Sequence, residues 1–142
     1  MISLEVRTGA REEILDLSAE IAQAVRREGL LEGVCVVFVP HTTAGVTVNE
    51  NADPDVKRDI LLALERIVPE DQDFRHAEGN STAHVKSLLC GSSVSVPVSG
   101  GSLVLGNWGG IYFCEFDGPR TRKLHLSFLP EDSKRCSEGR TE

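Results

Sequence analysis

Hydrophobic and polar residues alternate along several short stretches of this 142-residue chain, which is typical of strands that are buried on one face. Residues 2–7, 43–49 and 94–98 follow this pattern. Residues 34–40 are apolar throughout, which favours a strand buried on both faces. We expect residues 43–49 to pair with that strand as its antiparallel neighbour.

Other stretches place apolar residues at helical intervals. We expect a first helix over residues 10–29, where an apolar stripe ends at a glycine. A second helix is expected to begin at Asp53 and Pro54, because a capping carboxylate followed by proline is typical of a helix start, and to end before Pro69. The apolar face of the first helix would contain Ile14, Leu17, Ile21, Ala24 and Val25.

A polar loop over residues 70–80 separates the second helix from a short third one over residues 82–90. Asn80 or Ser81 is the expected N-cap of this helix, and Gly91 is its expected end.

The C-terminal part of the chain is expected to form a β-meander. Gly100 and Gly101 predict a tight hairpin, and residues 117–119 predict a second turn. The expected strands cover residues 94–98, 103–108, 111–116 and 124–128.

These elements predict one α+β domain over residues 1–130. Its mainly antiparallel sheet would curl into a barrel-like or sandwich core with two to three helices. Residues 131–142 are charged and, apart from Cys136, lack apolar side chains, so we expect a disordered tail there.

Composition narrows the classes of function. The formal net charge of -7 argues against nonspecific nucleic-acid or membrane binding, although local positive groups can still bind a small anion. No stretch approaches the roughly 20 apolar residues of a membrane span, and the start of the chain lacks a signal pattern, so we expect a cytoplasmic protein. The four cysteines contain no Cys-x-x-Cys pair, and three lie in apolar runs, as buried free thiols do.

Three of the four histidines lie in polar stretches rich in small residues: His41, His76 and His84. Imidazole is the commonest metal ligand, so together they are candidate metal ligands. Taken alone, His41 or His76 is more often a hydrogen-bonded surface residue. Their spacing matches neither a zinc finger nor a zincin helix, so such a metal site would have to be assembled by the fold.

Gly79, Asn80 and Ser81 precede the short helix that carries His84 and Lys86. Free N–H groups at a helix start favour an anion such as phosphate. The alternative is an ordinary helix cap.

Three further charged residues are candidates for chemistry. Glu50 suits a general base or a Mg²⁺ ligand, or is simply an exposed loop residue. Glu115 lies within an apolar strand and faces either inward or outward. Arg120 suits a bidentate contact with phosphate or carboxylate, or pairs structurally with Glu115 or Asp117.

Five segments in order resemble one known family, the YjbQ-like proteins, often described as secondary thiamine-phosphate synthases. The resemblance covers residues 1–128. The segments are His41-Thr-Thr-Ala, Asn49-Glu-Asn-Ala-Asp-Pro54, Gly79-Asn-Ser-Thr-Ala-His-Val-Lys86, Leu105-Gly-Asn-Trp108 and Glu115-Phe-Asp-Gly-Pro-Arg120.

The resemblance implies a β-barrel-like α+β fold that assembles as a homotrimer. It also implies a pocket in which His41, His76 and His84 lie together and hold a divalent metal. A histidine trio favours Zn²⁺, whereas departure of a diphosphate usually recruits Mg²⁺.

The other positions that match the family's polar motifs are Glu50, Asn80, Glu115 and Arg120. One position departs from the family, which usually has glutamine directly after the tryptophan. This chain has Gly109 after Trp108, which removes an amide from the expected pocket.

The activity that the resemblance implies joins a pyrimidine-methyl diphosphate to a thiazole phosphate and releases pyrophosphate. Arg120 and the helix start at Gly79–Ser81 would hold the phosphorylated substrate, and Glu50 or Glu115 would act in acid–base chemistry. The alternatives are a metal-dependent hydrolase of a small phosphorylated or acyl substrate, and a noncatalytic metal- or ligand-binding oligomer with the histidines at a subunit boundary.

Overall fold

The computed structural model describes residues 1–132, which form eight strands and three helices. The strands are β1 (Ile2–Arg7), β2 (Glu13–Asp16), β3 (Gly33–Phe38), β4 (Ala44–Glu50), β5 (Ser93–Ser99), β6 (Ser102–Leu103), β7 (Gly109–Glu115) and β8 (Thr121–Pro130). The helices are α1 (Ser18–Arg27), α2 (Pro54–Ile67) and α3 (Ser81–Cys90). The predicted α+β class with a mainly antiparallel sheet is confirmed. The tail predicted over residues 131–142 lies almost entirely outside the described residues.

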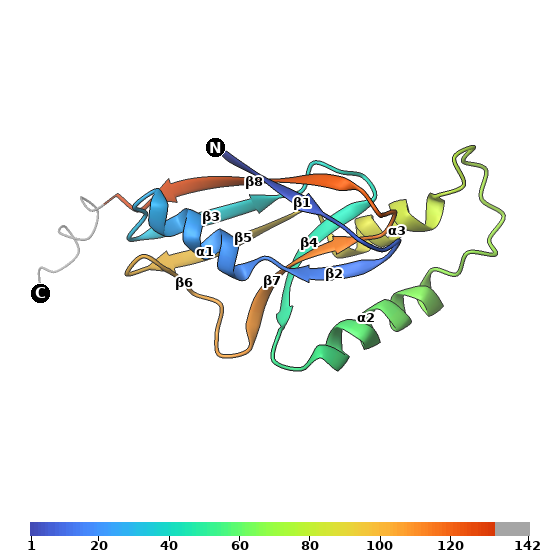
Figure 1. Ribbon diagram of the computed structural model, residues 1–142, viewed down its shortest axis with the longest axis horizontal. Helices are drawn as coiled ribbons and strands as arrows, with labels where there is room; N and C mark the ends of the chain where they lie inside the picture. Colours follow the sequence, from blue (N-terminus) through green and yellow to red (C-terminus); the bar gives the residue numbers. More distant parts are fainter. Residues whose placement is uncertain (133–142) are drawn as a thin grey trace, which may run out of the picture.

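The strands form two sheets (Figure 1). The larger sheet has the order β1-β8-β3-β5-β6, and the smaller has the order β2-β7-β4. Every pair in the two sheets is antiparallel. No helix in residues 1–132 is both long enough and apolar enough to cross a membrane.

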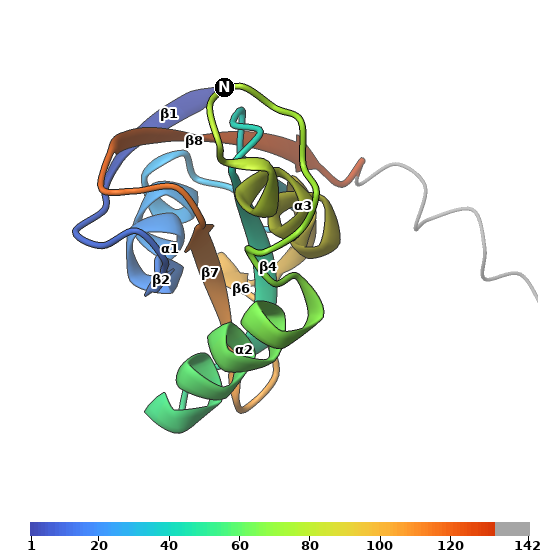
Figure 2. The ribbon, with the colours of Figure 1, turned by 90° about the vertical axis from the view of Figure 1, so that its right-hand side faces the viewer.

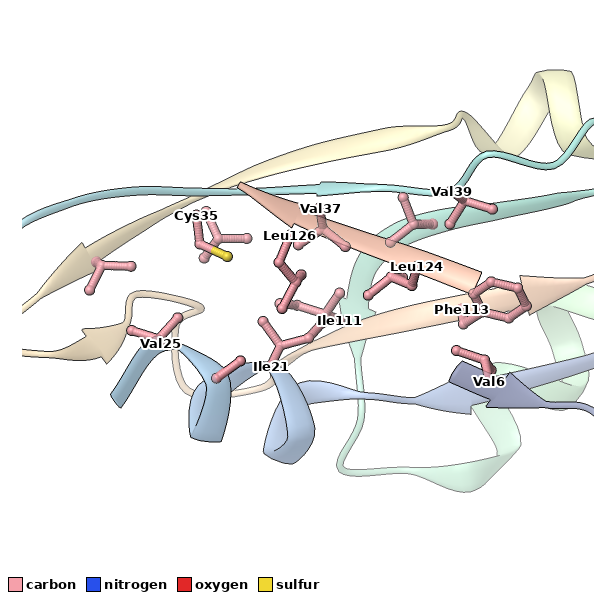
Figure 3. Packing of buried hydrophobic residues seen from close by; sticks show 14 of the residues in the cluster. Val6, Ile21, Val25, Cys35, Val37, Val39, Ile111, Phe113, Leu124 and Leu126 are labelled. Carbon is pink, nitrogen blue, oxygen red and sulfur yellow. The ribbon is translucent and has the colours of Figure 1, made fainter. Parts of the chain in front are cut away.

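The main hydrophobic core lies between the two sheets (Figure 3). The larger sheet contributes alternate residues such as Val37 and Leu126, the smaller sheet contributes Ile111 and Phe113, and α1 contributes Ile21. Only alternate side chains of a strand face this core.

The expectation that residues 34–40 are buried on both faces is therefore wrong. Cys35 and Val37 are fully buried, but Phe38 points to the opposite face and is 43% exposed.

A second, smaller core covers the outer face of the β2-β7-β4 sheet, where α2 and α3 lie (Figure 2). Tyr112 and Cys114 of β7, and Phe116 directly after it, project into this smaller core. Ile111 and Phe113 of β7 project into the main core. β7 is thus buried on both faces because helices cover one side and the larger sheet covers the other.

The predicted helix over residues 10–29 begins later than expected, because residues 13–16 form β2 and pair with β7. In this strand Ile14 contacts the smaller core and Leu15 the main core, which a helical face would not allow. The Asp16 carboxylate accepts a hydrogen bond from the Ser18 N–H at 2.9 Å, and the helix starts there.

Two predicted strand pairings are also wrong. β3 lies between β5 and β8, and β4 pairs with β7 in the other sheet. β7 and β8 do not form a meander, because the chain crosses from the smaller to the larger sheet at residues 117–120. The strand expected over residues 103–108 is reduced to the two-residue β6.

The predicted start of α2 and the predicted end of α3 are confirmed. The Asp53 carboxylate accepts a hydrogen bond from the Asp55 N–H at 2.9 Å, with Pro54 in the first turn. α3 ends at Gly91, whose φ of 96° favours glycine.

Candidate anion-binding site

A buried ion pair joins the two sheets at one end of the molecule. The Arg122 guanidinium of β8 donates to both oxygens of the Glu115 carboxylate of β7, at 2.8 and 2.5 Å. Glu115 is fully buried, and Arg122 is 5% exposed. The sequence left the direction of Glu115 open, and the structure shows that it faces inward.

Neighbouring groups satisfy the rest of this ion pair. The Thr8 hydroxyl and the Asp117 N–H donate to Glu115, and Arg122 donates to the Thr43 hydroxyl at 2.9 Å. Burial alone would raise the pKa of Glu115, but the hydrogen bonds from Arg122, Asp117 and Thr8 hold it below its usual value. Each Glu115 oxygen thus accepts two hydrogen bonds, which favours a structural role for this carboxylate.

Sequence reasoning missed Arg122, although the sequence contains a signal for it. Arg122 lies two and four positions before Leu124 and Leu126, so it is on the same face of β8 as these two leucines, which face the main core. An arginine in phase with buried leucines indicates a buried partner of opposite charge.

The turn after Glu115 carries a second polar junction at Asp117. Its carboxylate oxygen Oδ2 accepts hydrogen bonds from Asn80 Nδ2 and from Arg120 Nη2, both at 2.9 Å. Burial opposes ionisation, but these two donors keep the pKa of Asp117 below its usual value. The Asp117 carboxylate therefore holds the Arg120 guanidinium beside Asn80, the residue that precedes α3.

The amide of Asn80 has one defined orientation, because Nδ2 has to face the Asp117 carboxylate. Its Oδ1 points the other way, where it is buried and accepts no hydrogen bond from residues 1–132. Asn80 does not cap α3 through its side chain. The alternative that Asn80 is an ordinary side-chain cap of α3 is thus wrong.

A hollow of about 210 Å³ opens at the start of α3 and is lined in part by His76, Gly79, Ser81 and Thr82. The first helical N–H groups of such a helix have no acceptor within the helix and attract anions. Glu70 also lines this hollow, and the Glu70 carboxylate forms an ion pair with Arg11. We refer to Gly79, Asn80, Ser81 and Arg120 as the helix-start site.

The structure brings two of the three predicted histidines together. The rings of His76 and His84 meet edge to face, with centroids 5.3 Å apart. They share a hollow of about 410 Å³ with Ser81. His41 lies on the other side of His84, and these two line a separate hollow of about 530 Å³.

The pocket in which all three histidines act as ligands is not formed within the described chain. Among residues 1–132, no group of three His, Cys, Asp or Glu side chains is placed to hold a metal ion. His41 Nε2 instead accepts a hydrogen bond from the Lys123 N–H at 2.9 Å. Burial and the charge of Arg122 lower the pKa of His41.

Two other polar residues of the sequence lie outside the helix-start site. Lys86 is buried and forms an ion pair with Glu12. Glu50 lies at the far end of β4 from Ala44, which is paired with Glu115. The six residue-to-residue steps from Ala44 to Glu50 span about 20 Å of extended strand. A single copy of the chain therefore does not bring Glu50 to this site.

Comparisons with known proteins agree with the fold. The family model described as "UPF0047 protein YjbQ-like" matches residues 2–131. The chain belongs to this family. It is 45% identical to the UPF0047 protein YugU of Bacillus subtilis, covering 89% of this chain and 97% of the relative. It is 43% identical to a UPF0047 protein of Methanocaldococcus jannaschii, covering 91% and 94%.

Solved structures of the family have the same fold. An uncharacterised YjbQ/UPF0047 protein of Clostridium acetobutylicum is 47% identical, with a TM-score of 0.89, and covers 91% of this chain and 100% of its own. A hypothetical protein of Aeropyrum pernix is 37% identical, with a TM-score of 0.86, and covers 91% and 97%.

The local geometry explains why this YjbQ-like chain has glycine after Trp108. A Cβ atom at Gly109 would lie 2.2 Å from the carbonyl oxygen of Leu105. A side chain at this position therefore requires the backbone of residues 105–108 to move. Trp108 itself is 65% exposed.

The buried ion pair generates a stability prediction. Arg122→Met leaves the Glu115 charge buried without its partner, so we expect a loss of about 3–5 kcal/mol in unfolding free energy, measured by urea denaturation. Arg7→Met is the control, because the Arg7 side chain is 82% exposed and its pair with Glu5 contributes little. Equal effects of the two substitutions would contradict the role of the buried pair.

Proposed function

We propose that this protein is an enzyme that acts on a small phosphorylated substrate at the helix-start site. The reaction that we infer joins a pyrimidine-methyl diphosphate to a thiazole phosphate with release of pyrophosphate. The observation that carries the proposal is the junction at Asp117, which holds Arg120 and Asn80 at one carboxylate oxygen.

This junction favours phosphate for an electrostatic reason. The positive end of the α3 dipole attracts an anion to the hollow at the helix start. The Arg120 guanidinium, which Asp117 links to Asn80, adds a positive charge near that start. Arg120 is exposed and uses its Nε and Nη2 atoms on Asp117, which leaves Nη1 to donate to a phosphate. The unpartnered Asn80 Oδ1 is an acceptor for an N–H group of the substrate.

Departure of pyrophosphate is the step that needs stabilisation, because negative charge accumulates on the leaving group. N–H groups at the helix start and Arg120 would donate to that charge. His76 and His84 supply imidazole donors at the neighbouring hollow. Glu115, whose oxygens are fully occupied, would position the 117–120 turn rather than transfer a proton.

A divalent metal, Zn²⁺ or Mg²⁺, is not assigned a step here. The described chain offers the two adjacent imidazoles of His76 and His84, which do not make a complete ligand set. The free thiols of the described cysteines suit a reducing compartment, so we place the activity in the cytoplasm.

The role of Arg120 is tested by the variant Arg120→Ala. We expect a loss of roughly ten- to a hundredfold in kcat/KM for thiamine phosphate formation from the two precursors, because a hydrogen bond to a charged group contributes about 1.5–3 kcal/mol. Arg58→Ala on α2 is the matched control, since it removes one exposed positive charge elsewhere.

An unchanged rate in Arg120→Ala would contradict the assigned phosphate role. If the parent instead hydrolyses the diphosphate without joining the two precursors, and Arg120→Ala loses this hydrolysis, the protein is a hydrolase at this site and not a synthase.

We also propose that the protein assembles as a homo-oligomer, a homotrimer by its resemblance to the family. The outward face of α3 carries large apolar side chains beside His84, among them Leu88, which is 79% exposed. Exposed apolar clusters of this kind favour contact with another protein surface. A second copy on this face would lie next to the hollow that His41 and His84 share.

The assembly is tested by Leu88→Glu, which places a charge on this face. We expect a smaller particle mass than that of the parent in size-exclusion chromatography with light scattering. Leu31→Glu, at another exposed leucine, should leave the mass unchanged. An equal mass for the parent and Leu88→Glu would contradict an interface on α3.

A further inference from the structure

Two cysteines meet beneath helix α2, away from the helix-start site. Cys90 is the last residue of α3, and Cys114 lies in β7. Both line an apolar cavity of about 190 Å³ whose wall includes Ile60 and Leu64 of α2. They are separated by 24 positions in the sequence, so the fold and not a local motif brings them together.

A glycine creates the space in which the two sulfurs meet. Gly45 of β4 is directly opposite Cys114, so both residues face the smaller core. Because Gly45 has no side chain, Cys90 occupies that place: a Cβ on Gly45 would lie 2.8 Å from Cys90 Sγ. Cys90 thus packs against the buried cluster that contains Cys114, whose thiol donates to the Tyr112 carbonyl.

The environments of the two thiols differ in a way that assigns them different roles. The neighbouring Cys114 thiol lowers the pKa of Cys90, which is only partly buried. The neighbouring Cys90 and burial raise the pKa of Cys114. Cys90 is therefore the more readily ionised and the more accessible nucleophile.

Cys35 is the contrasting case within the same chain. It is fully buried in the main core, and burial raises the pKa of its thiol to about 11. It is not among the residues that line the apolar cavity. A cysteine of this kind is a small core residue with little reactivity.

We propose that Cys90 and Cys114 form a redox-active dithiol that a small organic disulfide oxidises to an intramolecular disulfide. The Cys90 thiolate attacks one sulfur of the reagent and releases one reagent thiolate. Cys114 then gives up its proton to solvent and attacks Cys90 Sγ, which releases the second reagent thiolate. The reagent takes up the two electrons that the thiols lose.

The new bond would join the C-terminal end of α3 to β7, next to Glu115. α3 carries His84 and begins at the helix-start site, so the oxidised protein has both ends of this helix fixed to the sheet region. The proposal rests on the placement of the two cysteines in one cavity and does not depend on the proposed reaction.

Peptide mapping tests the dithiol directly, because trypsin separates the cysteines by their positions. Cys90 and Cys114 fall together in peptide 87–120, whereas Cys35 falls in peptide 28–57 and Cys136 in peptide 136–140. The native protein is treated with dithiobis(nitrobenzoate), then unfolded, alkylated and digested. We expect peptide 87–120 to lose the mass of two hydrogens and take up no alkyl group, and peptide 28–57 to be alkylated normally.

Thiolate release gives a second readout in a Cys136→Ser background. Cys114→Ala should release half as many thiolates as that background and retain a nitrobenzoate adduct on Cys90. Alkylation of both cysteines in peptide 87–120, a nitrobenzoate adduct retained on that peptide in the parent, or a cross-link from it to residues 136–140 or to a second copy would overturn the proposal.

Discussion

The ion pair between Glu115 and Arg122 is the interaction on which the polar end of the molecule depends. Glu115 ends the central strand of the smaller sheet, and Arg122 lies near the start of β8 in the larger one. The chain crosses between the sheets in the six residues that separate them. Two buried charges are stable in this position because each is paired and further satisfied by Thr8, Thr43 and the Asp117 N–H.

The same ion pair explains where the candidate site lies. By fixing both ends of the 117–120 turn, it holds the Asp117 carboxylate toward the start of α3. Asp117 in turn orients Asn80 and Arg120, which gives an acidic protein one local arrangement that favours an anion. Stability and the proposed anion binding thus share one network, so substitutions in the ion pair are expected to affect both.

Signals that act over a few residues were sufficient to predict parts of the fold. The alternation of β1, the capping pair Asp53-Pro54 and the terminal Gly91 of α3 depend only on local backbone preferences. β2 was missed because it is only four residues long, and the spacing of its apolar residues suits either a strand or the first turn of a helix. The pairing of β4 with β7 was missed because it depends on which of two sheets a strand joins, a choice made by distant residues.

The same distinction applies to the site. Asn80, Ser81 and Arg120 were predicted from the types of residue around a helix start and a turn. The structure places Asn80 and Arg120 at one carboxylate, and Ser81 follows Asn80 at the start of α3. Arg122 was overlooked because its partner is seven positions away. Its burial can be inferred only from the alternation of β8, which places it on the same face as the buried leucines. Glu50 was grouped with the site although the length of β4 separates them, and the three histidines need more than the described chain to meet as ligands.

The central claim is that the network around Glu115 and Arg122 prepares an anion site at the start of α3. Amide chemical shifts during titration of the protein with inorganic pyrophosphate test it most directly. The account predicts saturable shifts that are largest at the Ser81 and Thr82 N–H groups and at Arg120 Nε, and that weaken as salt is added. Shifts that are absent there, or that are largest at the Glu50 and Trp108 end of the smaller sheet, would contradict it.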